Sequence, residues 1–322
     1  MEPKGPSPIA AADGLLQHVG LPLLSHLAEL RSRPNRRRPV LLLNGPVGVG
    51  KSTLVRQLAS LAPAHGLRLA VASIDDAYLP LPERLNRLAG NPFGVTRVPP
   101  GSHDVDLLVE RIEAWRGGAC LRLPRFDKTL AAGQGDRCGA SEETADALVL
   151  EGWLMGCRPL GEDAVAAGLA QLQDWNLSEA ERNWLPRWDR ELESYEPLWR
   201  IADGLWVLRP RRWCLARRWR FQAEARQRRA GGSWLAPEEL ERLVRSSLHS
   251  LPPPLYQDPL VARFDGPIEA HGDREGSFSP LANDLSGELP IVGVTQLDGR
   301  RRWEPLNHSA QLSPSSSSSA IG

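Results

Sequence analysis

The chain has 322 residues, in which 39 basic side chains balance 39 acidic ones. This length allows one large or two small domains with a sizeable buried core. Balanced charge argues against a general polyanion-binding protein. No apolar run approaches the length of a membrane span, and Met1-Glu2-Pro3-Lys4 lacks the pattern of a signal peptide. The four cysteines show no C-x-x-C spacing, so we expect reduced thiols in a cytoplasmic protein.

Residues 1–39 are predicted to form an N-terminal helix over the leucine-rich stretch 15–30, followed by an arginine-rich linker over 31–39. The leucines recur among polar residues, as on one face of a helix. We assign this region no chemistry.

The segment Gly45–Ser52 fits G-x-x-x-x-G-K-[ST], the phosphate-binding P-loop. An apolar run at 40–43 predicts a buried parallel strand before it, and leucines at helical spacing predict a helix that begins near Lys51. In this context Lys51 can reach the β- and γ-phosphates of ATP and act in catalysis, and the Ser52 hydroxyl can bind Mg²⁺. The residues predicted to bind the nucleotide are Gly45, Gly48, Val49, Gly50, Lys51, Ser52 and Thr53.

Two further strands are predicted to end in acids. The strand over 67–74 runs into Asp75, Asp76 and Tyr78. One of the two carboxylates could accept a proton from a substrate hydroxyl and the other could hold Mg²⁺ or its water, and Asp76 and Tyr78 are predicted to contact the substrate. Aspartates that merely cap a helix are the plain alternative. The apolar strand over 147–150 ends at Glu151, the position of a carboxylate that binds Mg²⁺ or its water in P-loop proteins.

Four basic residues between these strands are candidates for substrate binding. Arg97 and His103 lie at a loop-to-helix junction, which could equally be a capping cluster. Arg125 and Lys128 lie in the segment 121–128, where Arg125, Asp127 and Lys128 alternate in charge, as they also would on a solvated edge strand. Lys128 gains weight because the chain contains only three lysines, and the ammonium group differs from guanidinium in shape and hydration.

The segment 209–229 carries nine arginines. It could be a lid over about 209–235 whose Arg218 and Arg220 close on the transferring phosphoryl group, or a nucleic-acid patch, or for most of the nine a solvated helix face. A helix is predicted from Pro237 to Leu248. Residues 258–322 are predicted to be an irregular extension with a last strand at 291–294 and a disordered serine-rich tail at 313–319.

Several motifs together resemble a known family. Asp75-Asp76-Ala77-Tyr78 looks like the P-loop kinases that include uridine kinase, phosphoribulokinase and pantothenate kinase. Four further pieces narrow the resemblance to D-glycerate 3-kinase of the plant and cyanobacterial type: 97–104 resembles R-G-x-P-G-T-H-D, 124–128 resembles P-R-F-D-K, 151–156 resembles E-G-W-x-x-G, and 218–224 resembles R-W-R-L-Q-A-E. The likeness spans roughly 40–256. Ala77 and Val98 stand where the family has an aromatic residue and a glycine.

This resemblance implies ATP- and Mg²⁺-dependent phosphorylation of D-glycerate to 3-phosphoglycerate, the closing step of photorespiration. It also implies that Asp75 is the base and that Arg97, His103, Arg125 and Lys128 lie near the substrate. We therefore expect an α/β fold, a P-loop NTPase with a doubly wound parallel sheet and a helical lid, in a kinase domain over 40–257. A small-molecule substrate is expected, with no nucleic-acid or membrane partner; oligomeric state is left open.

Two other functions stay open at this point. One is another small-molecule kinase of the uridine kinase and pantothenate kinase group. The other is a nucleotide-dependent nucleic-acid-binding protein that uses the arginine-rich segment. A GTPase is disfavoured because the chain contains no N-K-x-D motif.

Overall fold

The computed structural model describes residues 14–34, 37–232, 234–264 and 288–304. Within these ranges no helix combines the length and the apolar character needed to cross a bilayer. The predicted serine-rich tail and most of the predicted irregular segment after 258 lie outside the described residues.

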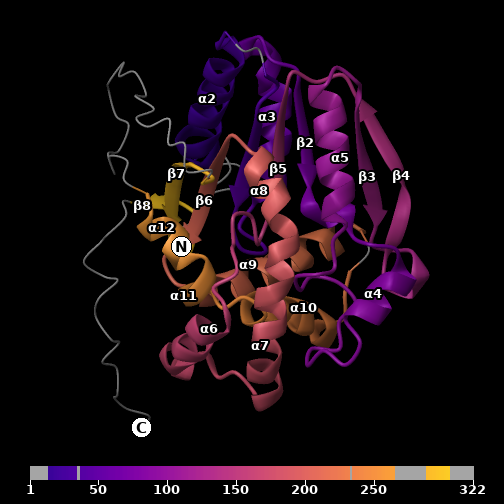
Figure 1. The fold of residues 1–322 in the computed structure, drawn as a ribbon, viewed down its shortest axis with the longest axis vertical. Coiled ribbons are helices and arrows are strands. Elements are labelled where there is room, and N and C mark those ends of the chain that lie inside the picture. The colour runs from indigo at the N-terminus through magenta and orange to yellow at the C-terminus, as the bar shows by residue number, and fades with distance from the viewer. Residues whose placement is uncertain (1–13, 35–36, 233, 265–287, 305–322) are drawn as a thin grey trace, which may run out of the picture.

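Strands and α-helices alternate up to β2 and then follow one another in short runs of up to four elements of the same kind (Figure 1). The strands are β1 (Val40–Asn44), β2 (Leu69–Ser73), β3 (Leu121–Asp127), β4 (Asp136–Glu143), β5 (Ala147–Gly152), β6 (Gly204–Pro210), β7 (Ile291–Leu297) and β8 (Trp303–Glu304). The helices are α2 (Leu21–Ser32), α3 (Lys51–Leu61), α4 (Leu81–Arg87), α5 (Val105–Arg116), α6 (Glu162–Leu169), α7 (Glu179–Glu191), α8 (Glu196–Ile201), α9 (Cys214–Arg229), α10 (Pro237–His249), α11 (Pro253–Tyr256) and α12 (Asp258–Ala262).

A six-stranded sheet with the order β2-β5-β1-β6-β7-β8 forms the centre of the fold. Its strands are parallel except β8, which pairs antiparallel with β7. Strands β3 and β4 form a separate hairpin beside α5, on the opposite side of the molecule from β7 and β8 (Figure 1). The predicted α/β fold with a parallel sheet is confirmed.

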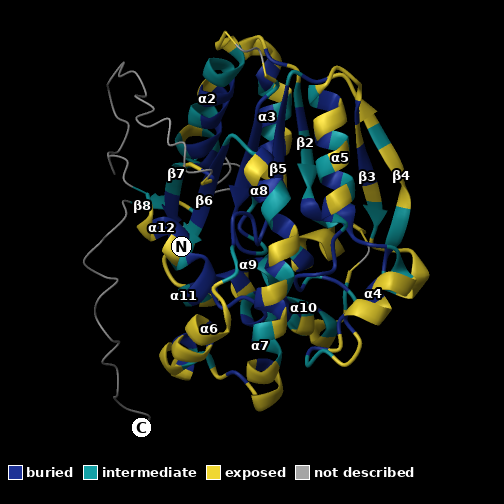
Figure 2. Cartoon of the chain, viewed as in Figure 1, coloured by how far each residue is buried: buried dark blue, intermediate teal, exposed yellow. Residues whose placement is uncertain are grey.

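The central strands β1 and β5 are buried on both faces, which explains why their side chains are apolar at successive positions. All five residues of β1 are buried, and successive side chains point to opposite faces. Leu42 joins one apolar core with residues of α5, α7 and α8. Leu41 and Leu43 join a second core with residues of α2, α3 and α9. Strands β1, β5 and β6 are accordingly mostly dark blue in Figure 2, while exposed residues line the outer faces of the helices.

The strand register places the candidate residues at one edge of the sheet. Asn44 at the end of β1 pairs with Gly152 of β5, and Ser73 at the end of β2 pairs with Glu151. The P-loop after β1, the acids after β2 and Glu151 in β5 therefore start from neighbouring points. Ligands of open α/β sheets bind at this carboxyl edge.

The predicted last strand forms and is longer than predicted. Strand β7 runs from Ile291 to Leu297 and pairs in parallel with β6. These residues therefore belong to the same sheet as the P-loop strand.

Candidate active site

The P-loop wraps tightly because two of its glycines adopt left-handed backbone angles. Gly48 has φ +76° and Gly50 has φ +114°, conformations that glycine adopts without the steric cost of a Cβ. Helix α3 begins directly at Lys51, so its free N–H groups face the loop. The buried Lys51 ammonium donates to the carbonyl oxygens of Gly45 at 2.8 Å and Pro46 at 3.3 Å. This arrangement fits the phosphates of a nucleotide.

Glu151 joins the P-loop to strand β5. Its carboxylate accepts a hydrogen bond from Ser52 Oγ at 2.6 Å and lies 3.7 Å from Lys51 Nζ. Among the described residues, no three His, Cys, Asp or Glu side chains gather as a metal cluster. A hydroxyl beside one carboxylate nevertheless suits Mg²⁺, which takes few protein ligands and keeps waters and substrate phosphates.

Asp75 follows strand β2, which is separated from the P-loop strand β1 by β5, and it is held by two donors. Tyr78 Oη donates to its Oδ1 at 2.8 Å, and Lys128 Nζ donates to its Oδ2 at 3.0 Å. Burial by itself would raise the pKa of Asp75, but the charge of Lys128, the field of His103 and the two hydrogen bonds together lower it well below its usual range. Asp75 is therefore ionised at neutral pH.

His103 lies behind Tyr78 rather than in the cleft. Its ring stacks on the Tyr78 ring with centroids 4.6 Å apart, and its Nδ1 lies 2.7 Å from Tyr195 Oη. Burial lowers the pKa of His103 to about 4, so the imidazole is neutral at pH 7. His103 thus positions Tyr78, which in turn holds Asp75.

The β3–β4 hairpin brings basic side chains to Asp75 and Asp76. Arg97 is buried and donates to the carbonyl oxygens of Gly133 and Gln134, which holds the tip of the hairpin. Arg125 is half-exposed, 3.9 Å from Asp76. Burial raises the pKa of Asp76 despite that arginine. Arg97, Arg125 and Lys128 all line the cleft, and His103 does not.

The two departures from the family pattern have different consequences. Val98 has φ +93°, which is strained for a β-branched side chain and natural for the glycine that the motif carries. Val98 lines the cleft. Ala77 is completely buried in the same core as Ile74 and does not line the cleft. An alanine in place of the family's aromatic residue therefore leaves the cleft wall unaltered.

A single cleft of about 1090 Å³ joins the P-loop, Asp75, Lys128 and Glu151. Helix α9 forms one wall, but its arginines differ in where they lie. Arg220 lines the cleft and is paired with Glu224 at 2.8 Å. Arg226 also lines it, whereas Arg218 is exposed and lies outside it. The structure therefore brings Arg220 to the site and leaves Arg218 at its margin.

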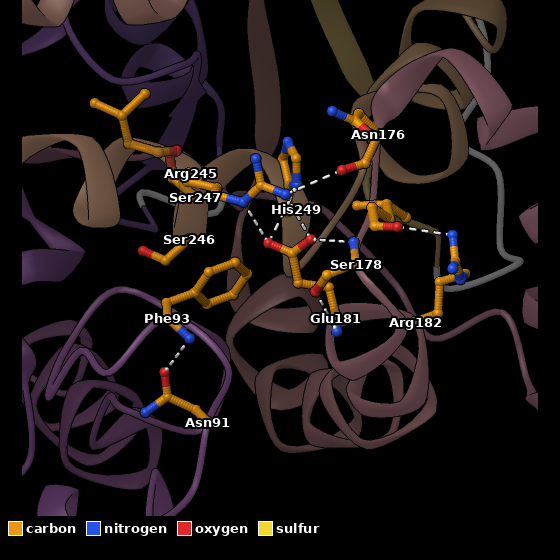
Figure 3. Close-up of polar contacts among 12 residues, drawn as sticks. Asn91, Phe93, Asn176, Ser178, Glu181, Arg182, Arg245, Ser246, Ser247 and His249 are labelled. Atoms are coloured by element: carbon orange, nitrogen blue, oxygen red, sulfur yellow. Dashed lines mark hydrogen bonds and ion pairs between the residues drawn. The ribbon is translucent and has the colours of Figure 1, made fainter.

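Helix α10 is anchored to α7 by a buried polar cluster (Figure 3). The Glu181 carboxylate accepts hydrogen bonds from Arg245 and from the Ser178 backbone N–H at 2.7 Å, and His249 Nδ1 lies 3.4 Å away. Burial alone would raise the pKa of Glu181, but these donors lower it to about 2. Because Val244 of the same helix lines the cleft, this cluster fixes one of its walls.

Sequence reasoning missed two arginines, one that lines the site and one that supports it from the interior. Arg84 is fully buried and donates to the carbonyl oxygens of Leu79 and Thr96 as well as to the hairpin tip. Arg301 lines the cleft and donates to the Gly48 carbonyl oxygen at 3.1 Å. Neither lies in a motif, and no local pattern marks either one.

No protein-family profile matches the chain. The chain is 31% identical over 268 residues to the chloroplastic D-glycerate 3-kinase of Arabidopsis thaliana. The alignment covers 79% of this chain and 54% of that protein. It thus spans about half the length of this plant relative. It is also 29% identical over 207 residues to the uncharacterized kinase mug58 of Schizosaccharomyces pombe, covering 61% of this chain and 73% of the relative.

A solved structure shares the fold. The D-glycerate 3-kinase of Cryptococcus neoformans var. grubii superimposes with a TM-score of 0.71 at 24% identity, over 91% of this chain and 99% of that one. The chain is homologous to these kinases and has their α/β P-loop NTPase fold.

Proposed function

We propose that this homologue of D-glycerate 3-kinase transfers the γ-phosphoryl group of ATP to D-glycerate and forms 3-phosphoglycerate. The observation that carries the proposal is the shared cleft, which is lined both by the P-loop and by the Asp75–Lys128 pair. A donor of phosphoryl groups and an acceptor hydroxyl would meet between them. The relatives named as kinases support the same reaction class.

At the nucleotide end, Lys51 and the N–H groups at the start of α3 would bind the phosphates. Ser52 and Glu151 would hold Mg²⁺, which neutralises charge on the phosphate oxygens. Phosphoryl transfer depends mainly on such positioning and charge stabilisation. The Ser52 hydroxyl already donates a hydrogen bond to Glu151, so the two oxygen atoms that would bind Mg²⁺ lie side by side.

At the acceptor end, Asp75 would take the proton of the substrate hydroxyl. Its low pKa makes it a weak base while Lys128 is bound to it. A substrate carboxylate would offer Lys128 a second anionic partner. If the Lys128 ammonium moves towards the substrate carboxylate, Asp75 loses the charge that lowers its pKa and becomes a stronger base. The exposed guanidinium of Arg125 can share the same carboxylate. A small hydroxy acid therefore suits this end of the cleft.

The arginine-rich segment fits a role in the cleft better than a nucleic-acid patch. Several of its arginines are paired with acids: Arg209 with Asp258, Arg211 with Glu304, Arg217 with Glu241 and Arg220 with Glu224. Pairing removes the free positive charge that phosphate contacts along a nucleic acid require. The free thiols of all four cysteines agree with the cytoplasmic location that forms part of this proposal. The photorespiratory role stays a prediction.

The test is ADP release with Mg²⁺·ATP and a panel of acceptors: D-glycerate, L-glycerate, uridine, pantothenate and ribulose 5-phosphate. D-glycerate should give the highest kcat/KM. Uridine lacks an anionic group and would leave Lys128 and Arg125 without a partner, whereas the larger pantothenate and ribulose 5-phosphate, and the mirror-image L-glycerate, would not bring a hydroxyl to Asp75 with the carboxylate on these cations. Lys51→Ala serves as the inactive control, since Lys51 bonds the P-loop carbonyls and not the apolar core. Higher kcat/KM for uridine or pantothenate would overturn the assignment of the acceptor.

A further inference from the structure

Arg301 lies in a tight turn between β7 and β8 that Asp298 holds together. The Asp298 carboxylate accepts the backbone N–H groups of Arg300 at 2.7 Å and Arg302 at 2.8 Å. Arg301 itself has φ +62°. A left-handed arginine is strained, and such strain persists where the surrounding structure holds it, most often at functional sites.

The turn carries the Arg301 side chain onto the P-loop. Its Nε donates to the Gly48 carbonyl oxygen and its second terminal nitrogen donates to the Trp219 carbonyl oxygen, both at 3.1 Å. The guanidinium carbon lies 5.4 Å from the centre of the Trp219 ring. Arg301 thus bridges the P-loop and helix α9 while it lines the cleft.

The charge of Arg301 is not balanced by an acid. Over the ranges 14–34, 37–232, 234–264 and 288–304, no carboxylate lies within ion-pair distance of it. Burial lowers the pKa of Arg301 to about 10, and the like charges of Arg226 and Arg218 act in the same direction. Arg301 remains protonated at neutral pH. A partly buried cation among like charges is costly unless an anion binds beside it.

We propose that Arg301 binds the phosphates of the nucleotide and that the turn 298–302 is a nucleotide-binding element of the P-loop site. The anion is assigned to the nucleotide because Arg301 is bonded to the P-loop itself, whereas Lys128 and Arg125 are the cations beside Asp75 and Asp76. The inference rests on the nucleotide half of the proposed function and is independent of the acceptor.

The test measures the Kd of Mg²⁺·ATP by calorimetry with no acceptor present, on three variants of the full chain. Arg301→Gly removes the side chain and suits the left-handed backbone. Arg301→Lys keeps the charge but loses the paired geometry of the guanidinium. Arg300→Ala is the matched control, because Arg300 is exposed and does not line the cleft.

Arg301→Gly should weaken ATP binding roughly 10- to 100-fold, the range expected for a lost charge-assisted contact. Arg301→Lys should recover part of that loss, and Arg300→Ala should bind as the wild type does. The melting temperature without nucleotide should change little in Arg301→Gly, because relief of backbone strain offsets the lost bonds. If Arg301→Gly proves unfolded, the Kd of Arg301→Lys decides.

Unchanged ATP affinity in the folded Arg301→Gly variant, or in Arg301→Lys if only that variant folds, would overturn the assignment. Weakening by the same factor in Arg300→Ala would do so too, since it would mean that general charge and not the contact matters. Wild-type protein that binds ATP through Arg301 but fails to phosphorylate D-glycerate would remove the proposed acceptor and leave this inference standing.

Discussion

Replacing Gly48 by alanine should force helix α9 away from the P-loop. An added Cβ would lie 2.4 Å from the backbone nitrogen of Arg220 and 2.6 Å from the carbonyl carbon of Trp219. These are backbone atoms of a helix, so they cannot rotate aside as a side-chain end can. The helix itself must move, or the loop must change shape.

The expected loss of stability has two parts. Gly48 has φ +76°, and a left-handed alanine costs roughly 1–2 kcal/mol. Overpacking against fixed atoms adds roughly 1–3 kcal/mol. Gly231 provides the control, because it has the same φ of +76° with nothing within 4 Å of the added Cβ. Gly231→Ala should therefore show the first part alone.

The assay is urea unfolding of both variants beside the wild type, followed by fluorescence of the buried tryptophans. We expect Gly48→Ala to lose about 2–5 kcal/mol of the free energy of unfolding and Gly231→Ala about 1–2 kcal/mol. ATP affinity should fall only in Gly48→Ala. Equal losses in the two variants would refute the tight packing of α9 on the P-loop.

Three further predictions follow from the site. Asp75→Asn should keep ATP affinity and lower kcat roughly 10²- to 10⁴-fold in steady-state assays; a larger fall in Asp76→Asn would exchange the roles of the two acids. Arg220→Ala should lower kcat more than it weakens ATP binding, whereas Arg218→Ala, exposed and outside the cleft, should change kcat less; the opposite ranking in the same assay would contradict the position of α9. The ionised Glu181 carboxylate stabilises the folded state at pH values above 4.5, its pKa in the unfolded chain. This stabilisation is lost as the pH falls towards 2, its pKa in the folded protein. The loss amounts to about 3 kcal/mol, so urea unfolding between pH 5 and pH 2 should show a shallower decline in Glu181→Gln, and parallel pH profiles would argue against the cluster.

Local sequence determined the nucleotide end of the site. The P-loop is one contiguous segment whose backbone shape follows from its glycines, and the helix at Lys51 follows it directly. The strands were predictable because a sheet buried on both faces requires apolar side chains at successive positions, as in β1 and β5. Asp75 and Glu151 could be placed at one edge because parallel strands end together.

The acceptor end depended partly on sequence and partly on packing. The scarcity of lysine drew attention to Lys128, and the structure places its ammonium 3.0 Å from Asp75. His103 stood in the same motif as Arg97, yet it packs behind Tyr78. Local pattern locates a residue on an element but does not say which face of that element meets the cleft.

Tertiary structure alone decided which arginines line the cleft. Arg218 and Arg220 are two positions apart on α9, so they lie on different sides of the helix. How the helix is rotated about its axis decides that Arg220 lines the cleft and Arg218 does not. Arg301 meets Gly48 across 253 residues of sequence. That contact exists because β7 pairs with β6 in the central sheet and returns through a left-handed turn. Strand order and helix rotation are set by long-range packing, which no local segment of the chain encodes.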